Sequence, residues 1–259
     1  MNRGKNKKKI KILIFIISYK ASYRILDVFN KIPFNKLKKY STKVLLSDDC
    51  SMDDTIEYAN KIKKKFKNVY VNENKKNLGY GGHIKQCLNY ALKKKINYAV
   101  MIHGDGQHNP KHIPNLLKLL INKENIGAVT GSRILGGFKK AVKGGMPFYK
   151  AIGNILLTNI FNLLMNTKFT DGHTGLWAYN LSLLKNRKHN YLTNSYNFDQ
   201  EFRFKNILEK RIIKEIPMQT KYADERSQLH ILYASRFFFS TLLFFLIKHR
   251  FLSSKKFTF

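Results

Sequence analysis

The sequence predicts an α/β domain built around a mainly parallel sheet. Short apolar runs alternate with longer segments of helical periodicity over the first half of the chain. This alternation is typical of βαβ units, in which consecutive strands lie parallel. The chain has 259 residues, of which 44% are hydrophobic. That is enough apolar material for one large domain with its own core, and it excludes a disordered basic tail protein.

The first half of the chain supplies most of the expected strands. The first, Ile10–Ile17, follows the basic segment Arg3–Lys11. A basic stretch before an apolar run resembles a secretion signal, but this run is short and no small-residue cleavage site follows it. The other expected strands are Lys43–Ser47, Val69–Asn72, Tyr98–His103 and Ala128–Gly131. Helices are expected between them, over Ala21–Lys31, Asp54–Lys65, Gly82–Lys94 and Lys111–Asn122.

The second half has longer helical segments. Phe148–Met165 is apolar on one helical face, Tyr196–Lys210 is a further expected helix, and Arg211–Met218 is a further expected strand. The apolar tail Leu229–Ile247 is interrupted by charged or titratable residues, whereas spanning a bilayer takes ~20 apolar residues. We expect a helix lying in the membrane interface, with a core helix over the sheet as the alternative.

Three segments follow from this pattern. They are a basic N-terminal tail at 1–9, a folded domain at 10–227, and an apolar and basic membrane-associating tail at 228–259. The two cysteines, Cys50 and Cys87, are too few for a disulfide framework and have no metal-site spacing. A reducing cytoplasm is the expected compartment.

Charge is the most unusual property of the composition. Lys and Arg number 48 against 16 Asp and Glu, a net charge of +32. Such a balance favours polyanionic partners: nucleic acid, an anionic membrane or phosphorylated substrates. A general enrichment in lysine at the surface is the alternative. From Asn125 to Thr170 there is no acidic residue, although Arg133, Lys140 and Lys150 lie in this stretch. We interpret it as a surface that receives anions, with 136–145 as a lid or an ordinary loop.

Polar clusters follow three of the expected strands. Asp48 and Asp49 follow the second, Asn77 and Gly79 follow the third, and the sequence His103-Gly-Asp-Gly-Gln107 follows the fourth. In open α/β sheets the ligand binds at the carboxyl ends of the strands, so these clusters are expected to meet at one edge. The site is therefore expected there.

The chemistry of these clusters points to a nucleotide and a metal. Carboxylates at a strand end, such as Asp48 and Asp49, accept hydrogen bonds from a nucleoside. His103, Asp105 and Gln107 offer three potential ligands for Mg²⁺ or Mn²⁺, ions that neutralise a leaving diphosphate. A glycine-rich turn capped by the aspartate is the alternative.

These motifs together resemble family 2 glycosyltransferases. Asp48–Thr55 resembles the nucleotide-binding motif of that family, and His103–Pro110 is similar to the Asp-x-Asp-x-Gln-His-x-Pro segment of its dolichyl- and polyprenyl-phosphate sugar synthases. Gly131-Ser132-Arg133, Thr174-Gly175 and Phe198-Asp199-Gln200-Glu201 match later motifs, in order. The chain departs from the family at Tyr19-Lys20-Ala21, at His103, at Leu176-Trp177, and at Lys150 and Asn154, which stand where the family has Arg and Ser.

The resemblance implies a GT-A fold and inverting transfer of a sugar from a nucleotide-sugar donor to a polyprenyl-phosphate-type lipid acceptor. It implies a location in the cytoplasm, peripheral to the inner face of an anionic membrane, with no nucleic acid partner. The implied nucleotide-binding residues are Tyr19, Asp48, Asp49, Asn77 and Gly79, and the implied metal ligands for Mg²⁺ or Mn²⁺ are His103, Asp105 and Gln107. Arg133, Lys150 and Asn154 would bind the acceptor phosphate, and the implied catalytic residues are Asp105, Arg133, Asp199 and Glu201.

Two alternatives stay open. A saccharide hydroxyl in cell-surface polysaccharide assembly is the alternative acceptor, and Asp199 or Glu201 would then take its proton. Both carboxylates have a structural alternative as surface ion pairs with Arg203 and Lys205. A basic nucleic-acid-binding protein is the minor alternative, disfavoured because carboxylate clusters repel phosphate backbones and no RNA-binding aromatic signature is present.

Overall fold

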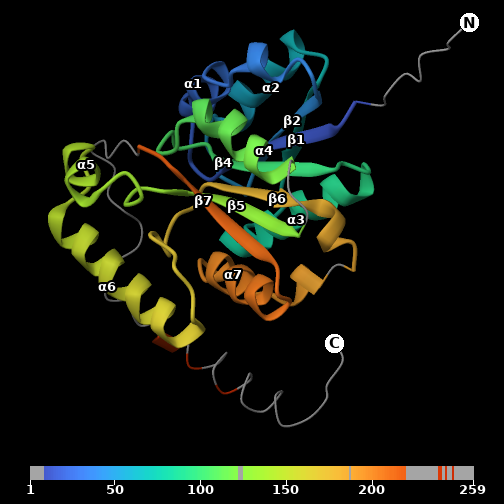
Figure 1. Cartoon of the computed structure of the whole chain (residues 1–259). Helices are drawn as coiled ribbons and strands as arrows, with labels where there is room; N and C mark the ends of the chain where they lie inside the picture. Colours follow the sequence, from blue (N-terminus) through green and yellow to red (C-terminus); the bar gives the residue numbers. More distant parts are fainter. Residues whose placement is uncertain are drawn as a thin grey trace, which may run out of the picture.

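The computed structural model describes residues 9–121, 125–186 and 188–219, together with residues 239, 240, 243 and 247. In this part of the chain, a seven-stranded sheet has the order β3-β2-β1-β4-β6-β5-β7 (Figure 1). The strands are β1 Lys11–Ser18, β2 Ser41–Asp48, β3 Val69–Glu73, β4 Tyr98–His103, β5 Ile126–Ser132, β6 Trp177–Asn180 and β7 Ile212–Pro217. All neighbours pair in parallel except β6, which is antiparallel to both β4 and β5.

Helices cover both faces of this sheet. They are α1 Arg24–Asn30, α2 Thr55–Lys65, α3 Tyr80–Lys93, α4 Ile113–Ile121, α5 Phe138–Lys143, α6 Phe148–Met165 and α7 Phe198–Leu208. Short 3₁₀ turns lie at Phe34–Leu37, Pro110–His112, Leu181–Leu184 and Lys188–Tyr191. The apolar side chains of α1, α2 and α4 pack on one face, and those of α3 and α7 pack on the other. The expected α/β fold with a mainly parallel sheet is confirmed.

The central strands read as continuous apolar runs because both of their faces are covered. In β1, every residue from Ile12 to Ser18 is buried. Strands buried on both sides lose the alternation of polar and apolar residues that marks a half-exposed strand. The expected strand at 10–17 and the expected helix Phe148–Met165 therefore lie where the sequence predicts them.

The sequence interpretation missed two elements. Residues 136–145 were expected to be a lid or a solvated loop, but α5 forms there, with Ala141 buried against Met146 and Ala151. The strand β6 was not expected at all, because its four residues are too short to carry a periodic signal.

The expected membrane-associating tail at 228–259 lies outside the described residues, except for Phe239, Ser240, Leu243 and Ile247, which are helical. Within the described part of the chain, we find no helix with the length and apolar character that crossing a bilayer requires.

Candidate functional site

The strand register brings the predicted polar clusters to one edge of the sheet. At the end of β1, Ser18 lies beside Asp48 of β2. One residue earlier, Ile17 lies beside His103 of β4. The expectation of a common edge is therefore met for the strands themselves.

Asp48 and Asp49 are both buried at this edge, and both are held by neutral donors. The two oxygens of Asp48 accept hydrogen bonds from the backbone N–H and the hydroxyl of Ser51. Asp49 Oδ1 accepts from Asn74 Nδ2 at 2.7 Å and from the Leu78 N–H at 2.9 Å. Burial raises the pKa of Asp48, and the Ser51 hydrogen bonds oppose this rise. The carboxylates thus shape the loops around the edge.

The segment after β3 folds back on Asp49. Asn77 Nδ2 donates to the Asp49 carbonyl oxygen at 3.3 Å, and Asn77 Oδ1 accepts from the Gly79 N–H at 2.9 Å. Gly79 has φ +73°, and a Cβ at this position would lie 2.8 Å from the Asn194 carbonyl oxygen. Only glycine meets both conditions. Tyr19, at the end of β1, has 44% of its surface exposed at the same edge.

The turn after β4 presents Asp105 and Gln107, both half-buried. Asp105 Oδ1 accepts from the Gln107 N–H at 2.9 Å, so the aspartate caps the turn as the structural alternative expected. No described residue donates a hydrogen bond to Asp105 Oδ2. One carboxylate oxygen therefore remains available to a ligand.

A Mg²⁺ or Mn²⁺ ion fits this turn only in part. Among the described residues there is no group of three or more His, Cys, Asp and Glu side chains placed to hold an ion. His103 Nε2 lies 3.4 Å from the Tyr80 hydroxyl, and burial lowers the pKa of the ring. Asp105 and Gln107 offer oxygen atoms, the donors such ions prefer, and Mg²⁺ is commonly bound by one or two carboxylates together with substrate phosphates. Asp105 and Gln107 alone therefore do not complete a metal site, but they fit an ion whose other ligands are the oxygens of a bound diphosphate.

Behind the β4 turn lies a buried pair that the sequence interpretation missed. The Tyr80 hydroxyl, at the first position of α3, donates to Asp199 Oδ2 at 2.8 Å. Burial raises the pKa of Asp199 to about 7, although the Tyr80 hydrogen bond acts against this rise. The ring of His103 packs against both Tyr80 and Gly175, where a Cβ would lie 2.7 Å from Nε2. Asp199 thus lies behind the turn after β4 that is predicted to bind a metal ion, and its pKa lies near neutral pH.

Glu201 and its neighbours on α7 make other contacts than the expected pairs with Arg203 and Lys205. Glu201 Oε2 accepts from the Thr193 N–H at 2.7 Å, which ties the preceding loop to the helix. Arg203 is fully buried, with its guanidinium carbon 4.5 Å from the centre of the Phe169 ring. Lys205 pairs with Glu209 at 2.9 Å. The alternative of surface pairs with Arg203 and Lys205 is therefore wrong.

After β5, Arg133 forms a two-pronged pair with Asp171, which is fully buried. The Nε–Oδ2 distance is 2.7 Å and the Nη2–Oδ1 distance is 2.8 Å. Burial alone would raise the pKa of Asp171, but the Arg133 guanidinium and the hydrogen bonds from Arg133 and Asn154 hold that pKa far below its usual range. Arg133, predicted to bind an acceptor phosphate, is therefore committed to a carboxylate inside the protein.

The other two predicted acceptor residues lie on α6. Asn154 is buried and donates from Nδ2 to Asp171 Oδ1 at 2.7 Å, so the structure places it in the support of Arg133 and not at a surface. Lys150 is half-buried on the first turn of the helix. Neither residue is among those that line the pocket described next.

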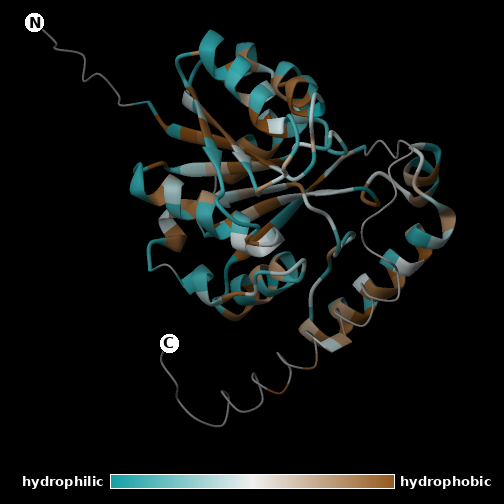
Figure 2. Ribbon diagram, turned by 180° about the vertical axis from the view of Figure 1, so that it is seen from behind, coloured by the Kyte–Doolittle hydropathy of each residue, from teal (hydrophilic) through white to brown (hydrophobic). Residues whose placement is uncertain are grey.

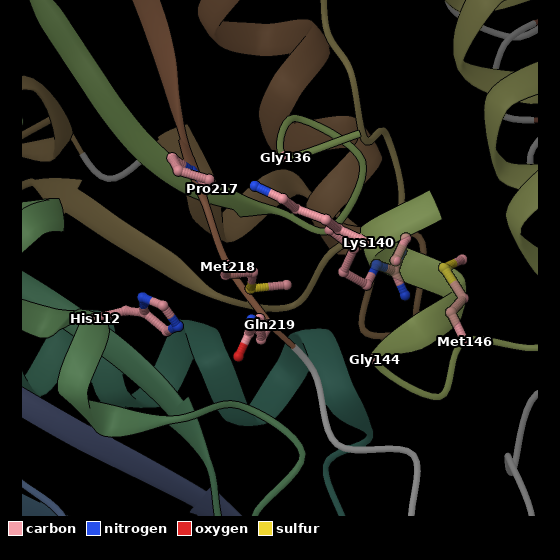
Figure 3. A pocket seen from close by; sticks show the side chains of 10 residues that line it. His112, Gly136, Lys140, Gly144, Met146, Pro217, Met218 and Gln219 are labelled. Atoms are coloured by element: carbon pink, nitrogen blue, oxygen red, sulfur yellow. The ribbon is translucent and has the colours of Figure 1, made fainter. Parts of the chain in front are cut away.

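A pocket of about 250 Å³ opens where β5 and β7 end (Figure 3). The basic residues in its wall are Lys140, Arg133, which is paired with Asp171, and His112, whose pKa is lowered by burial. Ala141, Met146, Pro217 and Met218 are apolar. Figure 3 places the α5 segment on one side and residues 217–219 on the other. Since β5 and β7 run parallel to β1 and β4, this pocket lies on the same edge of the sheet as the predicted nucleotide site.

The sequence interpretation missed Asp171 and Tyr80, and only one of them carries a signal. Asp171 is the single acidic residue between Glu124 and Asp199, so its isolation in a basic stretch marks it as a partner for Arg133. Tyr80 follows Gly79 in an ordinary helical segment, and nothing in the sequence connects it with Asp199, which lies 119 positions away.

Comparisons with known proteins agree on one family. The model of "Glycosyl transferase family 2" matches residues 14–188. An uncharacterised protein of Methanocaldococcus jannaschii is 32% identical over 73% of this chain and 74% of its own length. The UDP-N-acetylglucosamine–dolichyl-phosphate N-acetylglucosaminyltransferase of Methanococcus voltae is 28% identical over 79% of this chain and 87% of its own length.

Solved structures show the same architecture at low sequence identity. The glucosyl-3-phosphoglycerate synthase of Mycobacterium tuberculosis has a TM-score of 0.67 at 15% identity, over 91% of this chain and 80% of that chain. The mannosyltransferase PcManGT of Pyrobaculum calidifontis, in complex with GDP-Man and Mn²⁺, has a TM-score of 0.58 at 13% identity, over 86% of this chain and 59% of that chain. The GT-A fold is thereby confirmed.

Proposed function

The chain belongs to glycosyl transferase family 2, and from this premise we propose that it transfers a sugar, with inversion, from a nucleotide-sugar donor to a polyprenyl-phosphate-type lipid. The attacking phosphate oxygen forms a bond to the anomeric carbon while the bond from that carbon to the diphosphate breaks. A phosphate monoester is already ionised near neutral pH, so this reaction needs no general base. The nucleoside diphosphate leaves.

The pocket at the ends of β5 and β7 is the observation that carries the acceptor proposal. Its lining combines the exposed cation Lys140 and the Arg133 side chain, whose charge is already balanced by Asp171, with the apolar side chains of Met146 and Met218. A phosphate attached to a hydrocarbon chain needs both kinds of surface, whereas a sugar hydroxyl needs neither. The dolichyl-phosphate acceptor named for the M. voltae relative supports the same class of acceptor.

On the donor side, we propose that Tyr19, Asp48, Asp49, Asn77 and Gly79 form the nucleoside site. Asp105 and Gln107 would hold Mg²⁺ or Mn²⁺ together with the diphosphate, and the ion would supply positive charge where the leaving group becomes more negative. Relatives of this fold are solved with Mn²⁺ and nucleotides, which supports such an ion. We assign His103 to packing beside Tyr80, with ligation of the ion secondary.

A saccharide hydroxyl is the second candidate acceptor, and Asp199 is the observation that favours it. A general base works best when its pKa lies near the operating pH, and burial raises the pKa of Asp199 to about 7. Its hydrogen bond to the Tyr80 hydroxyl gives the proton a path from the turn after β4 to Asp199. Asp199→Asn and Glu201→Gln separate the two acceptors, because transfer to a phosphate should keep its turnover in both variants.

The function is tested by transfer itself. The protein is incubated with radiolabelled sugar nucleotides, Mn²⁺ and polyprenyl phosphate, and label should move into the organic phase. Label that moves only to soluble or lipid-linked saccharide would support the hydroxyl acceptor. A thermal-shift comparison should find stabilisation by a nucleoside diphosphate with Mn²⁺. Stabilisation by oligonucleotides alone would contradict the enzyme and favour a nucleic-acid-binding protein.

Several wider assignments belong to the same proposal. We assign the protein to the cytoplasm, peripherally attached to the inner face of an anionic membrane, where polyprenyl phosphates are exposed. The excess of basic residues, 48 Lys and Arg against 16 Asp and Glu, supports such a surface.

A further inference from the structure

Among the described residues, helix α6 packs one face against the domain and exposes apolar side chains on the opposite face. The inner face carries Ala151, Asn154, Thr158 and Phe161, all buried. Phe161 packs against Phe204 of α7, with ring centres 5.0 Å apart. A helix that is apolar all round is normally buried on all sides. The outer face of α6 therefore needs an explanation.

The outer face forms a continuous apolar stripe. Tyr149, Ile152, Leu156 and Leu163 follow one another at intervals of three, four and seven residues, which places them on one side of a helix. Their exposed fractions are 60%, 47%, 59% and 84%, in that order. Phe148 and Leu164 widen the stripe at its two ends. Figure 2 shows hydrophobic residues along α6, and Figure 1 places this helix at the periphery, away from the sheet.

Most other exposed apolar side chains in the described residues before residue 220 are scattered. Tyr191 on a 3₁₀ turn is 89% exposed, Met52 on a loop is 93% exposed, and each stands alone on its element. Single exposed apolar residues are ordinary on a protein surface, whereas a contiguous stripe marks a binding face. The stripe on α6 is therefore different in kind.

The charges around α6 suit an anionic partner. The exposed lysines Lys139, Lys140 and Lys143 lie on α5, which contacts α6. Lys150 lies on the first turn of α6, and exposed Lys168 follows its last turn. No acidic residue occurs from Asn125 to Thr170. An apolar stripe flanked by lysines is the pattern of a helix that lies in the interface of an anionic membrane.

We propose that the outer face of α6 is a membrane-docking surface that lies flat on anionic lipid. The choice of a lipid surface rests on the proposed function, but docking itself requires no sugar transfer. Three residues of the pocket wall, Lys140, Gly144 and Met146, lie in the segment directly before α6. Docking through α6 therefore holds the mouth of the pocket beside the membrane surface, where a lipid phosphate is presented.

A second set of exposed apolar positions has the same character. Phe239, Leu243 and Ile247 are helical and are 48%, 59% and 51% exposed. Their spacing of four residues places them on one side of a helix. We assign the main docking contact to α6, because its stripe adjoins the exposed lysines of α5 and the segment that lines the pocket.

The test is flotation of the full chain with lipid vesicles. The wild type should float with vesicles of phosphatidylcholine and phosphatidylglycerol, and less with phosphatidylcholine alone or at high salt. Leu163→Gln should weaken binding about tenfold, because it loses the burial of one leucine side chain. The double variant Leu156→Gln, Leu163→Gln loses two and should bind still more weakly. Tyr191→Gln is the matched control, since its side chain is equally exposed but lies off the stripe.

Four outcomes would overturn the proposal. The first two are a wild type that does not float and a double variant that floats as well as the wild type. The third is loss of flotation in the double variant Leu243→Gln, Ile247→Gln while the α6 variants still float. The fourth is a wild-type dimer, seen by sedimentation without vesicles, that the α6 variants abolish. Thermal midpoints of the variants should stay at the wild-type value, because the replaced side chains are exposed. Stabilisation by a nucleoside diphosphate with Mn²⁺ is measured on the same samples. If the wild type floats but is not stabilised by the nucleoside diphosphate with Mn²⁺, the sugar-transfer proposal is rejected and the docking surface is not.

Discussion

Two buried aspartates, one on each half of the sheet, are held in opposite ways. Asp49, at the end of β2, accepts hydrogen bonds from neutral groups, the Asn74 amide and the Leu78 N–H. Asp171, beside the end of β5, is paired with the Arg133 guanidinium and supported by Asn154. Neutral donors leave the negative charge of Asp49 uncompensated, whereas the charge of Asp171 is cancelled within the protein.

This difference indicates a role in ligand recognition for Asp49 and a structural role for Asp171. A carboxylate with its charge intact can attract the hydroxyl and N–H donors of a nucleoside. A carboxylate locked to arginine instead fixes the backbone around it, since the Arg133 N–H and the His173 N–H also donate to Asp171. We therefore expect substitutions at Asp171 to change stability. Substitutions at the edge where Asp49 lies, which also holds the turn after β4, should change ligand binding.

The largest effect is expected for Asp171→Asn. This change leaves the guanidinium of Arg133, whose side chain is 16% exposed, without its fully buried counter-charge. Breaking a buried pair costs about 3–5 kcal/mol. The free energy of unfolding, measured in urea, should fall by that amount.

The control for this change is Glu57→Gln, which breaks the exposed pair between Glu57 and Lys61, 2.6 Å apart. Exposed pairs of this kind are screened by solvent, so the loss should be far smaller than for Asp171→Asn. Equal losses in the two variants would show that Asp171 does not have the structural role assigned here.

The second effect is a pH dependence that runs opposite for Asp199 and Asp171. Burial raises the pKa of Asp199 to about 7, so folding takes up a proton between about pH 4 and pH 7 and stability falls as pH rises through this range. Asp199→Asn should remove a loss on the order of 2–4 kcal/mol at neutral pH. Asp171 has a lowered pKa and contributes stability that is lost only in strong acid.

Urea midpoints at acidic and neutral pH measure this difference. The wild type and Asp199→Asn should diverge as the pH approaches neutrality, with the variant the more stable. Parallel pH profiles for the two proteins would show that Asp199 is not the group that takes up the proton on folding.

The third effect concerns binding at the donor edge. Asp105→Asn removes the carboxylate whose Oδ2 is available to an ion, and we expect affinity for a nucleoside diphosphate with Mn²⁺ to fall about tenfold to a hundredfold. Calorimetry with and without Mn²⁺ measures it. His103→Gln should cost less, since His103 packs against Tyr80 and Gly175. An equal loss in His103→Gln would make the histidine a ligand.

The smallest effect is expected at the rim of the pocket. Lys140 is exposed and contributes a point charge, so Lys140→Gln should raise the acceptor KM about two- to fivefold and leave kcat unchanged. Lys118→Gln, on the exposed side of α4, removes the same charge away from the pocket and should change neither constant. A rise in KM in both variants would indicate a general effect of net charge.

The common edge of the polar clusters, the proposed donor site, could be predicted from the sequence because its geometry is local. Each polar cluster follows a strand, the strands are parallel, and parallel strands end at the same edge. Asp48, Asn77 and Asp105 therefore required only the order of the elements. Element ends were less certain: α3 begins at Tyr80 and not at Gly82, since Gly79, in its positive-φ conformation, ends the preceding turn.

The acceptor side could not be predicted to the same extent because its contacts join distant residues. Arg133 meets Asp171 across 38 positions, and Tyr80 meets Asp199 across 119. Sequence patterns place a charge on an element but do not say which other charge it faces. Arg133 and Asn154 were for this reason expected at an acceptor phosphate, whereas the structure pairs both with Asp171.

The position of β6 has a consequence for synthesis on the ribosome. Each of β2, β3 and β4 pairs with a strand that was translated before it, and β6 later adds to the free side of β4. β5 is different, because both of its partners, β6 and β7, are translated later. Until residue 217 has left the exit tunnel, β5 lacks a complete set of neighbours. Nascent chains that stall between α6 and β7 should therefore be the ones that chaperones hold longest.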